Sequence, residues 1–340
     1  MTNHLGLLSR AAIALIATML AATPALAQEA SVSLAALDDR GWDLAQTAEE
    51  TQALAPVTSL ALLESEPPAT DDPAITVRPP ARDHASFGKD VAAIKWEVAG
   101  IYGYYTAINA SKLFRDDRRN PRVIKEGWFG RDTKNVGVDK LAHAYSTYLV
   151  SEVIYSRLHQ KLGDTPGIAV SAAVLGSGVM AWSEAFDSIQ GDSGWSWEDV
   201  AMNTAGAGFS VLRNSVPGLD RKLDYRLMIE PNEDLYTISG KKHFEQQRYF
   251  FAVKPAGFKA FERSPLRFME VHVGYHAKDF LEEDRAAGIT PKRHIFVGVG
   301  PNFSEIFFKK KKKSRFERAA DEVVDYFQLP YTAVHAHVTE

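Results

Sequence analysis

The sequence contains no cysteine among its 340 residues. Disulfide bonds are therefore excluded, as is the lipid attachment of a bacterial lipoprotein, and stability must come from the core alone. The formal net charge of −4 gives no reason to expect a nucleic acid as a partner. The length and the ordinary composition, 45% hydrophobic and 24% charged, predict one large globular domain or two smaller ones.

Several motifs of common enzyme classes are also missing. The sequence has no Gly-x-Ser-x-Gly, no Walker loop and no His-Glu-x-x-His. The stretch "GVGPNF" at 298–303 lacks the strand–Gly-x-Gly-x-x-Gly–helix context of a dinucleotide site. There is no internal repeat either, so any function must rest on a less familiar arrangement of residues.

The N-terminal 86 residues predict an exported protein with a long linker. Residues 1–27 read as a signal peptide, with a charged start ending at Arg10, the apolar run "AAIALIATMLAA" and the cleavage motif "ALA" at 25–27. The run is shorter than the ~18–20 apolar residues of a spanning helix, which argues against a membrane anchor. Residues 28–86 hold 11 acidic and 3 basic residues and several prolines, which favours a largely disordered linker.

The remaining chain predicts an α+β protein, mainly α. Residues 87–228 follow a helical period and predict a compact bundle of four to five helices. Residues 229–340 change to a period of two and predict a small C-terminal antiparallel β element with one amphipathic helix at 314–329. The four clearest helices are expected at 87–114, 139–163, 167–189 and 196–213, and the strands at 247–255, 268–276, 293–303 and 332–338.

Polar pairs occur at one end of three of these predicted helices. Each pair is spaced three or four residues apart, so both members share one helix face. The second and third helices have a short connection and should be antiparallel, which brings the three ends to one level. The predicted site combines these pairs with their neighbours Lys140 and Ser196, the pairs being Asp139 with His143, Glu184 with Asp187, and Asp199 with Asn203. Asp192 and Glu198, in contrast, are expected to be turn residues that face solvent.

Each of these residues also has a purely structural interpretation. Ser196 and Asp199 fit an N-terminal capping pattern. Asp139 fits the start of a helix, where the dipole favours an acid, and Lys140 is typical of a surface or ion-paired lysine. The histidine and the asparagine fit polar groups that join helices in a core. The eight residues together are harder to explain by structural roles alone. Burying several carboxylates lowers the stability of the fold unless they are paired or bind a metal.

The motifs "DKLAHAYSTYLVSE" and "SEAFDSIQGDSGWSWEDVAMNTAGA" resemble the YfiM-like family of predicted periplasmic lipoproteins, a domain of unknown function. The resemblance covers about 120–215 and includes all eight residues of the predicted site. The resemblance implies a periplasmic location and association with a membrane, but it does not imply a particular reaction. The lipidation cysteine of the family is absent from this chain. A fainter similarity, in the Asp-Lys-x-x-His, Glu and Asp-x-x-x-Asn pattern, links the chain to VanZ-like membrane proteins.

Three further features favour partners or ligands. In the first predicted helix, the aromatic residues Trp96, Tyr102, Tyr104 and Tyr105 are expected to form an interfacial face. The run "KKKKK" at 309–313, followed by Arg315 and Arg318, fits either a solvated turn or a contact with anionic lipid. His335 and His337 share one face of a predicted strand, which fits an exposed strand or a metal-binding pair.

Two functions remain open from the sequence. The first is a non-catalytic envelope protein, peripheral to a membrane, that binds an envelope lipid or another envelope protein. The second is a hydrolase acting on an envelope lipid or glycan, with His143, Asp139, Glu184 and Asp187 as catalytic candidates, using either acid–base chemistry or a divalent cation. In the second, Lys140, Ser196, Asp199 and Asn203 would complete the binding cluster. A sealed polar network would favour the first function, and an open pocket over His143 and Glu184 the second.

Overall fold

The computed structural model describes residues 86–114, 116, 118–191, 193–231, 242–309 and 315–338. The predicted signal peptide, nearly all of the predicted linker and residues 310–313 of the lysine run lie outside these ranges. The same is true of Asp192. The predictions for those segments therefore stay predictions.

Three of the four predicted helices begin and end within two residues of their expected bounds. They are α4 (Val138–Leu162), α5 (Ile168–Asp187) and α6 (Trp197–Ser215). The first predicted helix is divided into α2 (Phe87–Ala93), α3 (Lys95–Asn109) and the 3-10 turn η3 (Ala110–Phe114). The break is at Ile94, which is fully buried, so packing of this side chain rather than a proline or glycine marks the bend.

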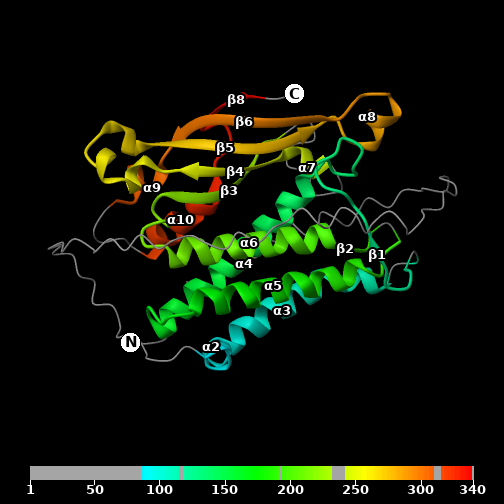
Figure 1. The fold of residues 1–340 in the computed structure, drawn as a ribbon, viewed down its shortest axis with the longest axis horizontal. Helices are drawn as coiled ribbons and strands as arrows, with labels where there is room; N and C mark the ends of the chain where they lie inside the picture. The colour runs from blue at the N-terminus through cyan, green and yellow to red at the C-terminus, as the bar shows by residue number, and fades with distance from the viewer. Residues whose placement is uncertain are drawn as a thin grey trace, which may run out of the picture. The chain divides into compact units, whose positions relative to one another are not determined.

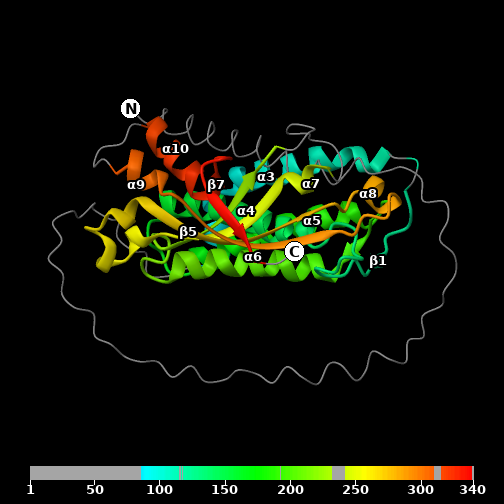
Figure 2. The same ribbon diagram turned by 90° about the horizontal axis from the view of Figure 1, so that it is seen from above.

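Helix α4 is the centre of the structure because two hydrophobic cores meet along it. Tyr145 and Tyr148 pack with Tyr225 and Tyr249 of the sheet. On its other side, α4 packs against α5 and α3 through a second cluster of apolar side chains. Figure 1 shows α3, α4, α5 and α6 below the large sheet, and Figure 2, seen from above, shows α10 (Arg315–Tyr326) and α6 at opposite edges of the protein.

Among the described residues, α5 alone is long and apolar enough to cross a membrane by length and composition. In its most apolar stretch, 61% of the helix is buried inside the protein. Its neighbours in the structure are α3, α4 and α6. This burial is what a core helix of a folded domain requires, and it accounts for the apolar run without a membrane span.

Small residues let α6 approach α4 closely. A Cβ added at Gly206 would lie 1.9 Å from the carbonyl oxygen of Ala144, a backbone atom that cannot move aside without shifting the helix. Two residues further along the helix, at Gly208, an added Cβ would meet nothing within 4 Å. The glycine at 206 is thus required by packing, and the one at 208 is not.

These two glycines give a matched test of the helix contact. We expect Gly206→Ala to lower the free energy of unfolding by about 1–3 kcal/mol, because the added methyl overpacks the α4–α6 contact. Gly208→Ala should raise it by up to ~1 kcal/mol through helix propensity alone. Urea denaturation of both variants checks this, and equal effects in the two would contradict the close approach.

The β region is larger than the small C-terminal element predicted from the sequence. It is a six-stranded sheet in the order β7-β3-β4-β5-β6-β8, antiparallel except for the β3–β7 pair. The strands are β3 (Leu223–Ile229), β4 (Gln247–Val253), β5 (Met269–Lys278), β6 (Lys292–Pro301), β7 (Phe327–Gln328) and β8 (Val334–His337).

Strand β3 lies within the 87–228 stretch that the sequence assigned to helices. Its sequence, "LDYRLMI", is a short run that fits a strand or a helix equally well, and pairing with β4 and β7 decides between them. Asp224 and Arg226 are buried in this strand and paired with each other, at 2.6 Å between Oδ2 and Nη2. Because two charged residues stand at alternate positions of this strand, its sequence does not show the apolar pattern expected of a central strand.

Short elements complete the fold. The predicted amphipathic helix is present as α10 (Arg315–Tyr326), which packs on β3. Two-residue strands β1 (Val123–Ile124) and β2 (Trp195–Ser196) pair in parallel beside the start of α6. The others are the helices α7 (Lys242–Gln246), α8 (Glu282–Ala286) and α9 (Phe303–Phe307) and the 3-10 turns η4 (Pro255–Gly257), η5 (Lys259–Phe261) and η6 (Pro265–Phe268).

Candidate functional site

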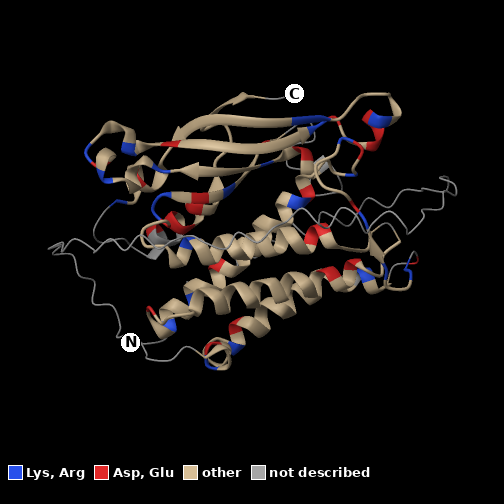
Figure 3. Cartoon of the chain, viewed as in Figure 1, with Lys and Arg blue, Asp and Glu red and all other residues tan. Residues whose placement is uncertain are grey.

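The start of α4, the end of α5 and the start of α6 meet at one end of the helical layer. Figure 3 shows acidic residues gathered at this end of α5 and α6. Here Nδ1 of His143 lies 3.2 Å from Oε1 of Glu184, and its Nε2 lies 3.6 Å from Oδ1 of Asp199. The helix spacing therefore placed these three residues correctly, one from each helix.

Lys140 fills the acidic end of the cluster. Its side chain is 1% exposed, and Nζ lies 2.5 Å from Glu126, 2.7 Å from Asp199 and 3.0 Å from Asp139. Burial alone would lower the pKa of the ammonium, but the three carboxylates raise it well above its ordinary value. Of the two roles expected for Lys140, a surface residue or an ion-pair partner, the structure shows the second, with the ammonium as a permanent buried cation.

Burial and charge separate the pKa values of the carboxyl groups. Burial raises the pKa of Glu184 to about 8, although the nearby His143 opposes the shift. Burial also raises the pKa of Glu126 to about 7. For Asp199 burial acts in the same direction, but His143 and Lys140 outweigh it and the pKa is lowered. One group is thus held ionised, while two others titrate near neutral pH.

His143 carries a proton near neutral pH in this environment. Burial disfavours its charged form, but Asp199 and Glu184 outweigh burial and raise the pKa of the imidazole to about 9. The pKa of Glu184 lies close to this value, so the two groups titrate as one coupled pair somewhat above neutral pH. The pair is suited to giving and accepting a proton.

A pocket opens over this pair. It has a volume of about 110 Å³ and is lined by residues of α4, α5 and α6 and of the segment 126–135. Nδ1 of His143 and Oε1 of Glu184 are buried atoms of the pocket wall that form no hydrogen bond, in spite of their short separation. The His143 side chain is 24% exposed, so the pocket gives solvent access to it.

The two remaining members of the predicted pairs lie beside the centre rather than in it. Asp187 accepts a hydrogen bond from Lys112 of η3 at 2.6 Å instead of facing His143. Asn203 accepts from the hydroxyl of Thr147 at 2.8 Å, one turn deeper along α6. Both side chains hold neighbouring elements in place, and Asp187 also lines the pocket.

Ser196 has the capping role that the sequence predicts. Its Oγ accepts a hydrogen bond from the backbone N–H of Asp199 at 3.3 Å. The same hydroxyl donates to Glu198, which was expected to face solvent but is only 6% exposed. Glu198 also accepts from the N–H of Gly127 at 3.2 Å, so it ties the loop before α4 to the start of α6. That expectation for Glu198 was wrong because a partner outside the helices buries it.

Two residues of the site were not predicted, Glu126 and Lys112. Both lie outside the long helices, Glu126 in an irregular segment and Lys112 in η3. Helical spacing identifies side chains that share a helix face, and it contains no information on loops that fold over that face. The only available signal was that "KEGW" precedes the Asp-Lys-x-x-His motif by a short distance.

The site offers one set of ligands suited to a divalent cation. One ligand atom each from His143, Glu184 and Asp199 lies within 4.8 Å of the other two. One imidazole and two carboxylates are ligands accepted by Zn²⁺ and similar ions. Glu126 and Asp139 form a second such group with Asp199, but the ammonium of Lys140 already neutralises it.

One family model matches part of the helical region. No curated protein matches the chain significantly, and no solved structure does. A family description of periplasmic lipoproteins agrees with the periplasmic location predicted from the sequence, and the absence of cysteine distinguishes this chain from lipid-modified proteins. Residues 125–215, which include every residue of the site except Lys112, match the family described as "Predicted periplasmic lipoprotein (DUF2279)".

Proposed function

We propose that the chain is a periplasmic hydrolase whose helical pocket performs acid–base chemistry on an envelope lipid or glycan. The observation that supports this proposal is the pocket over His143 and Glu184. Nδ1 of His143 and Oε1 of Glu184 face each other at 3.2 Å, and the His143 side chain is 24% exposed, so the pair is not sealed from solvent. Polar groups that serve only to join helices are normally sealed and fully hydrogen-bonded, since each unsatisfied group costs stability.

The proposed roles follow from the charges around each group. Glu184 and His143 would give and accept the transferable proton as a coupled pair, because they lie 3.2 Å apart and their pKa values of about 8 and 9 are close together. Asp199 stays ionised and would stabilise positive charge that develops on the substrate. Nζ of Lys140 lies 2.7 Å from Oδ1 of Asp199 and holds this carboxylate in position. Lys140 itself does not need to contact the substrate.

Hydrolysis can be tested with the purified chain and isolated envelope fractions. We expect mass spectrometry to detect cleavage products from the lipid or the glycan fraction. Glu184→Gln and His143→Ala should each reduce product formation by about 100-fold or more, the usual contribution of a general acid or base. The matched control is His159→Ala, which removes a second α4 histidine that also lies 3.2 Å from a carboxylate, Asp164, but is 43% exposed.

The same assay separates the two forms of the proposal. Activity that survives EDTA supports acid–base chemistry by the protein alone. Activity that is lost with EDTA and restored by a divalent cation would place that cation on His143, Glu184 and Asp199. Absence of any product, or full activity in Glu184→Gln with a normal melting temperature, would favour the non-catalytic envelope protein.

We further propose that the chain lies against an anionic membrane surface through one end of its sheet. Here η4, η5, η6 and α9 contact one another. They expose large apolar side chains, and the exposed basic residues Lys259, Arg263 and Lys309 belong to these elements or follow them closely in the sequence. Figure 3 shows basic residues at this end of the sheet. Apolar side chains within a basic surface are typical of interfacial binding. The exposed apolar residues are Phe258, Phe261, Leu266, Phe268, Ile306 and Phe307.

This surface replaces an expectation for the first helix. Trp96, Tyr102, Tyr104 and Tyr105 were expected to form an interfacial face. Tyr105 is only 1% exposed, and Tyr102 and Tyr104 pack into the core shared by α3, α4 and α5. Trp96 alone is highly exposed, at 77%. The aromatic residues of α3 therefore serve mainly to bury the helix.

Vesicle binding tests the membrane surface. We expect the chain to sediment with vesicles that contain phosphatidylglycerol and to be released by high salt. Phe261→Ser combined with Phe307→Ser should weaken binding by about tenfold or more, since burying each aromatic side chain contributes roughly 1.5–3 kcal/mol. Trp96→Ser is the control and should bind like the wild type. Equal binding by the double variant would contradict the proposed surface.

A further inference from the structure

Five of the ten histidines of the chain lie on one face of the sheet, far from the helical pocket in sequence. His272 and His276 belong to β5, His294 to β6, and His335 and His337 to β8. Strand alternation places those on β5 on one face, because they are four residues apart. None of these five histidines has a role in the proposed hydrolysis.

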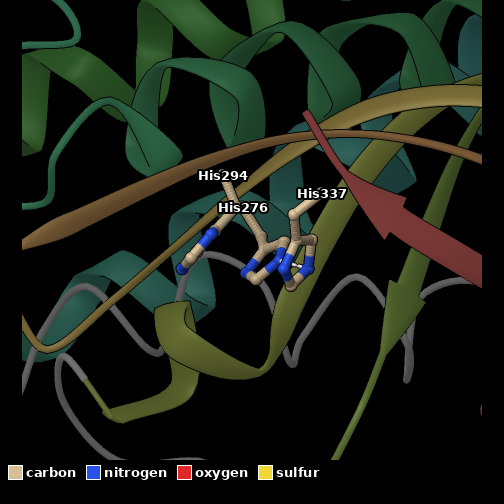
Figure 4. Close-up of side chains that lie close together, drawn as sticks. All are labelled: His276, His294 and His337. Atoms are coloured by element: carbon tan, nitrogen blue, oxygen red, sulfur yellow. Dashed lines mark hydrogen bonds between the residues drawn. The ribbon is translucent and has the colours of Figure 1, made fainter. Parts of the chain in front are cut away.

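The register of the strands brings three of these histidines together. His276 is paired directly with His294 across β5 and β6. Phe296, two residues after His294 and on the same face, is paired with His337 of β8. One imidazole from each of three neighbouring strands therefore converges on one point, as Figure 4 shows.

The three rings are close enough for common ligands. Nε2 of His276 and Nε2 of His337 are 3.1 Å apart. The ring centroid of His294 lies 4.7 Å from that of His276 and 4.5 Å from that of His337. One nitrogen from each ring lies within 4.8 Å of the other two. In a tetrahedral zinc site, bonds of about 2.0–2.1 Å place ligand nitrogens about 3.3 Å apart, so small rotations of the rings suffice.

The surrounding structure fixes the rings and leaves one side open. His276 and His294 are 1% and 7% exposed, whereas His337 is exposed at the end of β8. Nε2 of His276 forms a hydrogen bond with Nε2 of His337 at 3.1 Å, and the ring also packs against His294 and Phe296. Ligation through these nitrogens would replace the hydrogen bond by one bond from each ring to the same ion.

Curvature of the sheet encloses this face. The ring centroids of Phe250 on β4 and His335 on β8 are 6.0 Å apart, although β5 and β6 lie between the two strands. In a flat sheet three strand spacings amount to about 14 Å. The sheet therefore curls toward the histidines, which limits access to the side of His337.

We propose that His276, His294 and His337 bind a late first-row transition metal, with Zn²⁺ as the reference ion, and leave a fourth position open to solvent. Three imidazoles without a carboxylate or thiolate favour Zn²⁺ and Cu²⁺ over Mg²⁺ and Ca²⁺, which require oxygen ligands. Three protein ligands with an open position are the composition of a zinc site that exchanges water or a further ligand. The proposal is independent of the function proposed for the helical pocket.

Calorimetric titration of the EDTA-treated full chain with ZnCl₂ tests the site. We expect wild-type protein to bind one Zn²⁺ at the sheet and to show no such binding of Mg²⁺ or Ca²⁺. His337→Asn should lower the Zn²⁺ affinity by at least ~100-fold, because losing a ligand costs more than losing an outer partner. His337 is exposed, so this variant should fold, and Zn²⁺ should raise the melting temperature of the wild type but not of the variant.

Two controls locate the ion. His335→Asn removes a histidine of the same strand and face that pairs instead with His272, at 3.1 Å, and should keep Zn²⁺ binding. His143→Ala removes the histidine of the helical pocket and should keep it as well. The proposal is overturned by wild-type affinity in His337→Asn, by an equal loss in His335→Asn, by a loss in His143→Ala alone, or by no Zn²⁺ binding in the wild type.

Discussion

Replacing Lys140 by methionine is expected to destabilise the protein by about 3–5 kcal/mol. The ammonium is buried and lies within 3.0 Å of three carboxylates, those of Glu126, Asp139 and Asp199. Methionine fills a similar volume but leaves these acids in a poorly solvated site without their cation. Because breaking a buried ion pair leaves an uncompensated charge, the loss should far exceed that of a surface pair.

The matched control is Lys161→Met on the same helix. Its Nζ lies 2.8 Å from Glu97, but the side chain is 37% exposed. Exposed pairs contribute about 0–1 kcal/mol, so this variant should unfold close to the wild type in urea. Similar losses in the two variants would show that Lys140 is not the buried centre of the acidic cluster.

Replacing Arg226 by methionine is expected to cost a similar amount, about 3–5 kcal/mol. Its guanidinium donates to Glu270 at 2.7 and 3.0 Å and to Asp224 at 2.6 Å, and all three side chains are at most 1% exposed. Lys254 remains 2.8 Å from Asp224 in the variant, but Glu270 loses both of its charged hydrogen bonds. The sheet should therefore unfold at markedly lower urea concentration.

Arg157→Met provides the comparison for this arginine. Arg157 donates to Glu97 at 2.8 Å, and both side chains are partly exposed. We expect a loss of at most about 1 kcal/mol. A loss in Arg226→Met no greater than this would contradict the view that one buried ion network holds β3 and β5 together.

The helices and their polar ends could be predicted from the sequence because each depends on local spacing. Apolar period and terminal glycines define α4, and its two polar residues at 139 and 143 share a face by geometry alone. Because the connection to α5 is short, the two helices are antiparallel, and the end of α5 with Glu184 lies beside the start of α4. Nothing beyond neighbouring segments is needed for these inferences.

Features that depend on distant pairing could not be predicted. Glu126 joins the site only because an irregular segment folds over the start of α4. The alternating charged residues of β3 do not look like a central strand in the sequence. They fit one only once their ion-pair partners Glu270 and Lys254 are known. The histidine site on the sheet depends on the register of β5, β6 and β8, and of its members only His337 was considered, as one half of a pair with His335.

The pKa of His143 tests the proposed proton-sharing pair most directly. Titration of the imidazole by NMR in EDTA-treated protein should give a value of about 9, raised by Asp199 and Glu184 above the ordinary 6.5. Since the folded pKa is raised, the stability that His143 contributes should be complete below pH 6.5 and lost as the pH rises through 9. In Glu184→Gln the pKa should fall clearly, whereas His159→Ala should leave it unchanged. A His143 pKa near 6.5 that does not respond to Glu184→Gln would contradict the shared proton and the acid–base function built on it.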